Sequence, residues 1–468
     1  MSGAADLSVA EAASLLHSRE LSPVDYVAAF LERIARHESD LNAFLQVFSD
    51  SSLADARAAE VEINEGRWRG PLHGVPIALK DLFDIVGEPT TAHSRILRGH
   101  RAERSAHVVT KLREAGAIII GKTALHEFAT GGPSFDLPWP PARNPWRRTH
   151  HPGGSSSGSA VAVAAGLAPA SLGTDTAGSV RNPATCCGVV GMKPTYGAVS
   201  RTGVFPLAFS LDHVGPITRG VEDNAILLEA MLGRDAEDPT SVAHPRSDLR
   251  ADLARGIDGL RIGVIEAFHA EADPEIRAAM DEAIKVIESL GGRIEPIHLS
   301  ALDTYVGCGR LILQAEAFAI HEHWLKTRPL DYGARGRVRL LPGAFLGAAD
   351  YIRAQQLRTM LVREFTQAIA HVDAVIAVSS LELPCEIDDE AKIDRTYDRQ
   401  ARTPFNVTGT PALSLPIGFS KSGLPIGMQV LGKAFDEAMI YRIAHAYEQA
   451  TPWHLRRPNL DPAAIPAQ

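Results

Sequence analysis

Two clusters of glycine and serine carry the strongest chemical signal in the sequence. The first is Gly153-Gly-Ser-Ser-Ser-Gly-Ser159, and the second is Leu172-Gly-Thr-Asp-Thr-Ala-Gly-Ser-Val-Arg181. An isolated cluster of this kind is usually a linker or a turn. The second cluster, however, places Asp175 and Arg181 on either side of a Gly-Ser pair, in a segment apolar enough to be buried. Buried polar and charged side chains must be paired, so we expect a hydrogen-bonded site here.

Backbone N–H groups in the second cluster suit the stabilisation of a negative charge. The four residues from Thr176 to Ser179 have small side chains, so their consecutive N–H groups can converge on one point. Such an arrangement favours an anion, or the oxyanion that develops when a carbonyl carbon is attacked. Ser179 would lie beside that point as a nucleophile and would need a base to accept its proton. The cluster by itself does not identify that base.

Alternating helix and strand signals around the clusters predict an α/β fold. A capping box at Ser8 and Glu11 opens a first helix, and Ser22-Pro23 starts a second helix that runs to about residue 36. Short apolar runs next to glycine or proline indicate buried strands, and longer periodic stretches indicate helices. The predicted strands cover 77–79, 116–120, 259–265 and 373–378, and the further helices cover 53–64, 106–115, 159–167, 274–290 and 350–371.

Two segments match the sequence patterns of known motifs, the P-loop and the G-x-S-x-G nucleophile motif, but not the secondary structure that those motifs require. Residues 116–123 have the spacing GxxxxGK[ST], but the Ala-Ile-Ile-Ile between the glycines favours a strand, whereas a P-loop follows a strand and turns its N–H groups toward phosphate. Residues 154–158 have the G-x-S-x-G spacing with Ser156 at the centre. That motif requires a strand leading directly into the serine, and residues 146–152 carry no strand signal. We therefore predict neither a nucleotide-binding loop nor a nucleophile at Ser156.

The composition excludes several other classes of protein. With 45% hydrophobic and 22% charged residues the chain can build a core, and no apolar run approaches the roughly 18 residues that span a membrane. A net charge of −9 argues against a broad nucleic-acid surface, because phosphate binding depends on Lys and Arg. Four cysteines without C-x-x-C spacing, histidines without an H-E-x-x-H pattern and an N-terminus without a signal peptide favour a reduced, cytoplasmic protein without a metal.

The two clusters resemble the signature of the amidase signature family, serine hydrolases that cut amide and related bonds. The similarity extends from about residue 8 to residue 450. It includes five further segments, Gly74-Val-Pro-Ile-Ala-Leu-Lys80-Asp81, Gly121-Lys-Thr123, Arg143-Asn-Pro-Trp146, Asp212-His-Val-Gly-Pro216, and Asn406-Val-Thr-Gly-Thr-Pro411 with Leu424-Pro-Ile-Gly427.

The resemblance implies a catalytic triad of Ser179 as nucleophile, Ser155 as bridging serine and Lys80 as base. In the family the peptide bond before the bridging serine is cis, so we expect a cis bond between Gly154 and Ser155. A free lysine titrates near 10.4, so Lys80 would need burial and a neighbouring positive charge to lower its pKa. Neutral Lys80 would then draw the proton of Ser179 through Ser155. The relay would need no metal or organic cofactor.

The resemblance also assigns residues that support the site. It places the oxyanion hole on the N–H groups of Thr176, Ala177, Gly178 and Ser179, and it places Ala129 near the reacting carbonyl. Asp175 and Arg181 match residues that brace the loop. Two positions depart from the family pattern, which usually has glycine in place of Ser157 and of Ala177. An alanine normally keeps φ below zero, so the oxyanion loop is expected to be tighter than in the family.

Length alone, 468 residues, would suggest about three domains, but the resemblance implies one catalytic unit. We expect a single large α/β domain with a mixed, twisted sheet covered by helices on both faces. Residues 1–65 would form an N-terminal helical segment packed on the core, residues 66–460 the amidase signature domain, and residues 461–468 a C-terminal tail. Residues 300–348 and 384–402 have weak periodicity and are candidates for substrate-facing insertions.

Two functions remain open. The one we favour is a stand-alone hydrolase that cleaves small-molecule amides, anilides, esters or carbamates, without nucleic-acid or membrane contacts and with a homodimer as an open alternative. The other is the A subunit of glutamyl-tRNA amidotransferase, which releases ammonia from glutamine for a partner. That subunit binds the α-ammonium group of glutamine with an acidic residue. The corresponding position in this sequence is Arg399, and Asp398 lies one position away. A cation there would repel the ammonium, although Arg358 approximately matches the carboxylate-binding arginine.

One loop is a candidate wall of the substrate pocket. The aromatic and proline-rich segment from Phe135 to Pro141 could present an apolar surface to an aryl or alkyl acyl group. A rigid surface loop is the alternative interpretation of the same residues.

Overall fold

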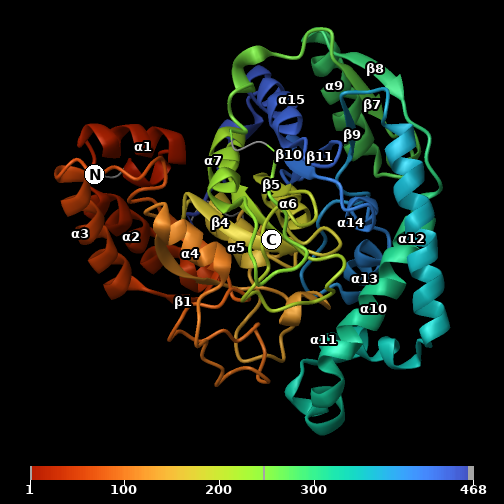
Figure 1. Ribbon diagram of the computed structural model, residues 1–468, viewed down its shortest axis with the longest axis horizontal. Helices are drawn as coiled ribbons and strands as arrows, with labels where there is room; N and C mark the ends of the chain where they lie inside the picture. The colour runs from red at the N-terminus through yellow and green to blue at the C-terminus, as the bar shows by residue number, and fades with distance from the viewer. Residues whose placement is uncertain (1–2, 246–247, 462–468) are drawn as a thin grey trace.

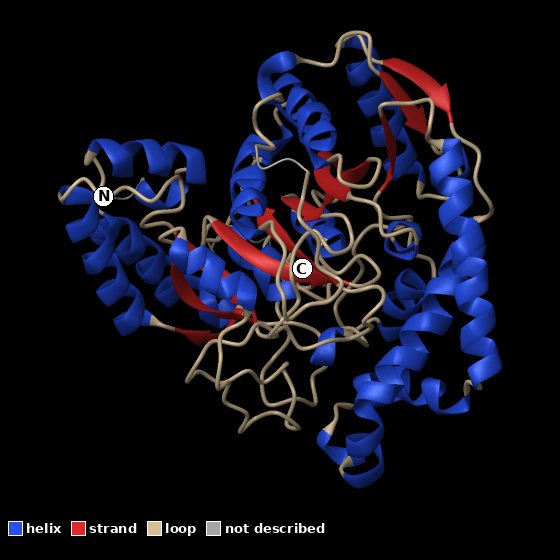
Figure 2. Ribbon diagram, viewed as in Figure 1, coloured by secondary structure: helices blue, strands red, loops and turns tan. Residues whose placement is uncertain are grey.

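The computed structural model of the protein describes residues 3–245 and 248–461, and these residues contain one eleven-stranded sheet (Figure 1 and Figure 2). The strand order is β1-β3-β2-β4-β6-β5-β10-β11-β9-β7-β8, and neighbouring strands pair in both directions, so the sheet is mixed. The strands are β1 (Phe44–Val47), β2 (Pro76–Lys80), β3 (Ile118–Thr123), β4 (Ala170–Asp175), β5 (Val190–Lys193), β6 (His213–Thr218), β7 (Arg261–Val264), β8 (Arg293–Pro296), β9 (Ala374–Val378), β10 (Ala412–Phe419) and β11 (Pro425–Leu431).

Two groups of helices contact this sheet. Helices α5 and α6 pack on each other and contact β2, β4 and β5, whereas α7, α15 and α9 contact β6, β10 and β9. The predicted α/β fold is thereby confirmed. The helices are α1 (Val9–Ser18), α2 (Pro23–Leu41), α3 (Ser49–Asn64), α4 (His107–Glu114), α5 (Ser157–Ala164), α6 (Arg181–Cys187), α7 (Val221–Met231), α8 (Glu266–His269), α9 (Pro274–Ser289), α10 (Leu302–Thr327), α11 (Ala334–Leu340), α12 (Ala348–Ala368), α13 (Glu390–Asp398), α14 (Thr403–Val407) and α15 (Glu437–Ala450).

Three neighbouring strands bring chemically important residues to one edge of the sheet. Strand β2 pairs in parallel with β3 on one side and with β4 on the other. The three strands end at Lys80, Thr123 and Asp175. Carboxyl ends of parallel strands meet at the same edge, where the following loops can build a site. The prediction that Lys80 ends a buried strand is confirmed, because every residue of β2 is buried.

Helix α5 holds the first Gly/Ser cluster close to the strands. At Gly158, an added Cβ would lie 2.2 Å from the carbonyl oxygen of Ala43 and 2.5 Å from the backbone nitrogen of Ala124. Only a residue without a side chain allows this approach. The Ala/Val residues that follow are all buried, as their composition predicts.

Helix boundaries agree with the sequence at the N-terminus and differ from it near residue 300. The capping box of Ser8 and Glu11 is present, and α2 begins after Ser22 but continues to Leu41, beyond the expected end. Residues 300–348, which have weak periodicity in the sequence, contain the 26-residue helix α10. Helix α10 contacts α11, α12 and α14. A helix that contacts several other helices need not have a single apolar stripe, which is consistent with its weak periodicity.

The structure supports the rejection of the two letter-only motifs. Gly121, Lys122 and Thr123 belong to β3, and the buried Lys122 forms an ion pair of 2.7 Å with the buried Asp81. Ser156 is completely buried, and its Oγ lies 3.3 Å from the carbonyl oxygen of Thr174. Lys122 is therefore held in a buried ion pair, and Ser156 is not accessible as a nucleophile.

Membrane and metal features are absent from the residues with assigned positions. Within 3–245 and 248–461, no helix has both the length and the apolarity to cross a bilayer. The same ranges contain no group of three or more His, Cys, Asp or Glu side chains placed to hold a metal ion. Beyond residue 461, the expected C-terminal tail lies outside the described residues.

The close approach at Gly158 predicts a specific loss of stability. Gly158→Ala should lower the free energy of unfolding by about 1–3 kcal/mol, because the new methyl group collides with backbone atoms that cannot move independently. Gly307→Ala on α10 is the matched control, since an added Cβ there meets no atom within 4 Å. Urea unfolding followed by circular dichroism compares the two variants. Equal stability of both variants would contradict the close packing of α5.

Candidate active site

Lys80 lies between two hydroxyl groups and is completely buried. Its Nζ atom is 2.8 Å from Ser155 Oγ and 2.8 Å from Thr174 Oγ1. Burial lowers the pKa of Lys80 to about 7, although the negative charges of Asp212 and Asp175 act in the opposite direction. The positive neighbour expected from the sequence is not what lowers this pKa. A large fraction of Lys80 is therefore neutral near pH 7 and able to accept a proton.

Hydrogen bonds join the two Gly/Ser clusters. The N–H of Ser156 donates to the carbonyl oxygen of Ser179 over 3.1 Å, and the N–H of Thr174 donates to Ser156 Oγ over 3.3 Å. The peptide bond between Gly154 and Ser155 is cis, which confirms that prediction. These contacts hold the residue after Ser155 against the backbone of Ser179.

Ser179 is partly exposed and lines a cavity of about 110 Å³. Ala129, expected near the reacting carbonyl, lines the same cavity. No hydrogen bond joins the Oγ atoms of Ser155 and Ser179, although the structure describes both residues. The structure thus places Lys80 in hydrogen-bond contact with Ser155, whereas the hydroxyl of Ser179 is not hydrogen-bonded to Ser155.

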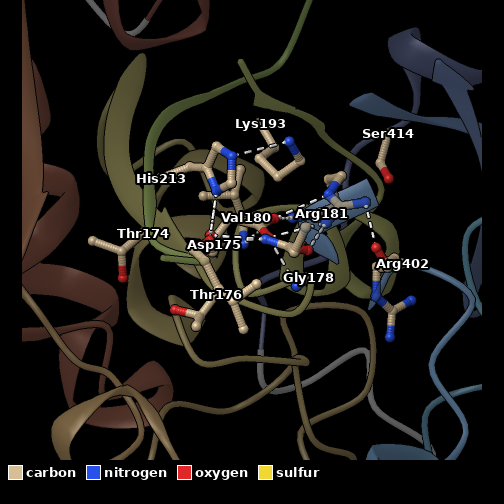
Figure 3. A network of polar contacts seen from close by, with 12 residues as sticks. Thr174, Asp175, Thr176, Gly178, Val180, Arg181, Lys193, His213, Arg402 and Ser414 are labelled. Atoms are coloured by element: carbon tan, nitrogen blue, oxygen red, sulfur yellow. Dashed lines mark hydrogen bonds and ion pairs between the residues drawn. The ribbon is translucent and has the colours of Figure 1, made fainter. Parts of the chain in front are cut away.

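The carboxylate of Asp175 organises the loop that precedes Ser179 (Figure 3). It accepts hydrogen bonds from the N–H groups of Gly178 at 2.8 Å and Val180 at 3.2 Å. The Nε and Nη2 atoms of Arg181 each lie 3.0 Å from it, and both side chains are completely buried. Burial opposes ionisation of Asp175, but the charge and hydrogen bonds of Arg181 outweigh it and hold the pKa of Asp175 well below its usual range. The two residues predicted to brace the loop therefore form a buried ion pair.

One of the four N–H groups predicted for the oxyanion hole is already engaged. The N–H of Gly178 donates to Asp175, so the structure differs from the prediction at this position. A buried carboxylate has to be satisfied by donors, and the nearest backbone N–H groups meet that need. The N–H groups of Thr176, Ala177 and Ser179 have no acceptor within the described part of the chain.

The two departures from the family pattern fit without backbone strain. Ala177 avoids the left-handed region, because the positive φ of the loop, 121°, falls on Gly178. A side chain at Gly178 would meet Arg402, whose Nε would lie 2.7 Å from the new Cβ. Ser157 is buried as the first residue of α5. The position in this loop that requires glycine is therefore Gly178, which has a positive φ and packs against Arg402, and not Ala177.

The sequence did not predict several residues that contact Asp175, Arg181 or Lys80. Asn406 donates to Asp175 Oδ1 over 2.9 Å and accepts from Arg181 Nη2 over 2.6 Å, and Gln429 accepts from Arg181 Nη1 over 2.7 Å. Asn406 begins the family-like segment 406–411, and Gln429 lies two residues after Leu424-Pro-Ile-Gly427. These segments were recognised in the sequence, but the sequence did not indicate which residues they contact. Thr174, the second partner of Lys80, lies on β4, which pairs in parallel with β2, and no local pattern in the sequence indicates this contact.

A second cavity of about 650 Å³ adjoins the first and shares Ala129 and Leu207 with it. Tyr196, Phe205, Phe209 and Tyr351 provide its aromatic surface. The loop expected to form an apolar wall, residues 135–141, contributes no side chain to the described lining of either cavity. Its rings face elsewhere, because Phe135 is 57% exposed and Trp139 packs edge-on against His93.

Comparison with known proteins places the chain in a family. The model of the Amidase family matches residues 25–441. The chain is 38% identical over 485 residues to the A subunit of the glutamyl-tRNA(Gln) amidotransferase of Gloeobacter violaceus, covering 98% of this chain and 99% of that protein. It is also similar to the solved peptide amidase of Stenotrophomonas maltophilia, with 32% identity, a TM-score of 0.85 and coverage of 97% and 98%. The solved A subunit of the Thermotoga maritima amidotransferase has 35% identity, a TM-score of 0.82 and 96% coverage of both chains. The protein therefore belongs to the amidase family.

The lowered pKa of Lys80 predicts how Ser179 reacts with a fluorophosphonate. The labelling rate should rise about tenfold per pH unit below pH 7 and level off above it, because only neutral Lys80 can accept a proton through Ser155. Lys80→Met should react at least about 100-fold more slowly and without this inflection. Lys326→Met, which removes an exposed lysine, is the control. A wild-type rate that stays flat from pH 5 to pH 9 would exclude Lys80 as the base.

The buried ion pair predicts a large loss of stability when its cation is removed. Arg181→Met should lower the free energy of unfolding by about 3–5 kcal/mol, because Asp175 is left charged and unpaired in the interior. Arg36→Met serves as the control, since Arg36 pairs with Glu32 on the surface and should contribute less than about 1 kcal/mol. Denaturant titration measures both. The brace is refuted if Arg181→Met is no less stable than the control.

Proposed function

We propose that this protein hydrolyses amide bonds through an acyl-enzyme formed on Ser179. The observation that carries the proposal is the buried Lys80, whose Nζ lies 2.8 Å from Ser155 Oγ and whose pKa is lowered to about 7, next to the segment that holds Ser179. Membership of the amidase family supports the same class of reaction. The cavity at Ser179 gives a small substrate access to the nucleophile.

The reaction begins when the hydroxyl of Ser179 turns toward Ser155. Ser155 passes its proton to neutral Lys80 and accepts the proton of Ser179, whose Oγ bonds to the carbonyl carbon. The N–H groups of Thr176, Ala177 and Ser179 stabilise the oxyanion. When the intermediate collapses, the C–N bond breaks and the leaving nitrogen takes back the proton through Ser155. Water then cleaves the acyl-enzyme ester by the same relay and releases the acid.

We favour a stand-alone enzyme for small amides. Anilides, esters and carbamates react by the same acyl transfer, and the larger cavity offers aromatic surface to a bulky leaving group. One solved relative is a peptide amidase, which supports the hydrolysis of amides other than glutamine.

A glutaminase subunit is the second candidate, because several full-length relatives are amidotransferase A subunits. Two positions argue against it. Arg399 lies where that subunit has an acid for the glutamine ammonium, and it pairs with Glu271. Arg358, the approximate match to the carboxylate-binding arginine, donates to the backbone carbonyls of Val407 and Ser210. The side chain of Asp398, one position from the acid slot, lies outside the described part.

Loss of the nucleophile should abolish turnover of every substrate. Ser179→Ala and Ser155→Ala should each lower kcat by about 10⁴-fold or more, whereas Ser289→Ala on the exposed side of α9 should leave it unchanged. A panel of propionamide, acetanilide, p-nitrophenyl acetate, a phenyl carbamate and glutamine measures the activity, and intact mass with peptide mapping locates the acyl group. Acylation of a residue other than Ser179, or full activity of Ser179→Ala, would refute the mechanism. Glutamine hydrolysis that appears only with added partner subunits would favour the second candidate.

A further inference from the structure

The buried carboxylate of Asp212 lies against the site, although the proposed relay gives it no part. Asp212 immediately precedes β6, which pairs antiparallel with β4. Continued by one residue, the register of these two strands places Asp212 opposite Thr176, the first residue of the loop 176–179. Asp212 also lines the larger cavity, together with Thr174, the second partner of Lys80. A carboxylate in this position can act both on the loop and on the lysine.

Both oxygens of Asp212 accept hydrogen bonds from neutral donors. Its Oδ1 atom accepts from the hydroxyl of Thr176 over 2.5 Å. Its Oδ2 atom accepts from the N–H groups of Leu207 at 2.9 Å and Ala208 at 3.0 Å. Thr176 and Leu207 both line the small cavity at Ser179. Asp212 therefore holds two segments of the wall of that cavity, and one of them carries an N–H group assigned to the oxyanion.

The negative charge of Asp212 also acts on Lys80. Burial lowers the pKa of Lys80 to about 7, and of the charges that oppose burial, Asp212 has the larger influence and Asp175 the smaller. The charge of Asp175 is balanced by its ion pair with Arg181. Burial raises the pKa of Asp212 to about 6, so this carboxylate is still charged at neutral pH.

The cations and the histidine near Asp212 do not neutralise it. No arginine or lysine within residues 3–245 and 248–461 forms an ion pair with Asp212. Arg201 lowers the pKa of Asp212 through its charge, but its Nε atom lies 3.6 Å from Asp238, with which it pairs. On β5, Lys193 donates to backbone carbonyls. His213 is uncharged at neutral pH, because burial lowers its pKa well below the usual value.

The other carboxylates that line the larger cavity have partners of their own. Glu237 and Asp238 pair with arginines, and Glu316 on α10 accepts hydrogen bonds from two neutral hydroxyl groups. Of the acids that line this cavity, Asp212 is the one whose charge raises the pKa of Lys80.

We propose that Asp212 is a positioning residue of the reaction, which fixes Thr176 through its hydroxyl and keeps a negative charge facing Lys80. This inference rests on the proposed function of Ser179. Asp212 forms no bond to the substrate and transfers no proton. Through Thr176 it keeps an oxyanion donor in place, and through its charge it keeps the amine of Lys80 a strong enough base to accept a proton.

Removal of the charge should move the pH at which the site becomes reactive. Asp212→Asn keeps an oxygen that can accept a hydrogen bond but removes the negative charge, so Lys80 should lose its proton at lower pH. The inflection in the rate of fluorophosphonate labelling at Ser179 should move down by about one pH unit. Asp212→Glu, which retains the charge, should keep the inflection near that of the wild type. Asp331→Asn is the control, because Asp331 pairs with Arg328 on the surface.

Variants of Thr176 test the positioning without changing the acid. Thr176→Val removes the hydroxyl and keeps the shape of the side chain, so it should lower kcat and the plateau rate of labelling by about tenfold or more, with little change in KM. Thr176→Ser keeps the hydroxyl and should retain most of the activity. Thr359→Val is the control, because the hydroxyl of Thr359 donates to a backbone carbonyl on the exposed side of α12.

The outcomes separate this inference from the proposed function. An unchanged inflection in folded Asp212→Asn would overturn it, and so would equal activity of Thr176→Val and Thr176→Ser. If Asp212→Asn does not fold, the two Thr176 variants decide the question, since both keep the carboxylate. Labelling of Ser179 in the wild type would in each case still support the hydrolase. If the fluorophosphonate fails to label Ser179 in the wild type, the proposed function itself fails.

Discussion

A lysine removed from water must either find a counter-charge or lose its proton, and this constraint governs the site. Lys80 is completely buried, and its hydrogen-bond partners are the neutral hydroxyls of Ser155 and Thr174. The nearby carboxylate of Asp175 is engaged by Arg181, and that of Asp212 accepts hydrogen bonds from Thr176 and from backbone N–H groups. Burial therefore prevails, and the amine is poised to exchange a proton near neutral pH.

The remaining architecture serves to keep this lysine and its partners in place. Parallel pairing of β2 with β3 and β4 brings three strand ends to one edge, and α5 approaches the backbone closely enough to present Ser155 to Lys80. The ion pair of Asp175 and Arg181 then ties the loop of residues 176–179 to residues from the last third of the chain, including Asn406 and Gln429. A site assembled from such distant segments explains why the chain forms one unit rather than the three that its length suggests.

The sequence predicts the parts of this arrangement that depend on local signals. Alternating apolar runs and capping residues indicate the α/β class, the buried strand before Lys80 and the helix at Ser8. The resemblance to a family indicates the cis bond before Ser155. Contacts between distant segments are not encoded in any local pattern, so the capture of the Gly178 N–H by Asp175 and the pairing of Lys80 with Thr174 required the structure. Helix α10 was not predicted, because its residues show no clear amphipathic stripe.

The charge state of Lys80 is the central claim, and it can be measured without any substrate. NMR of protein labelled with ¹³C at the lysine Cε atoms reports the titration of each amine, and the spectrum of Lys80→Met identifies the signal of Lys80. The account predicts a midpoint near pH 7, while the exposed lysines titrate near 10.4. A midpoint for Lys80 close to 10.4 would show that the amine is charged at neutral pH and would contradict its role as the base.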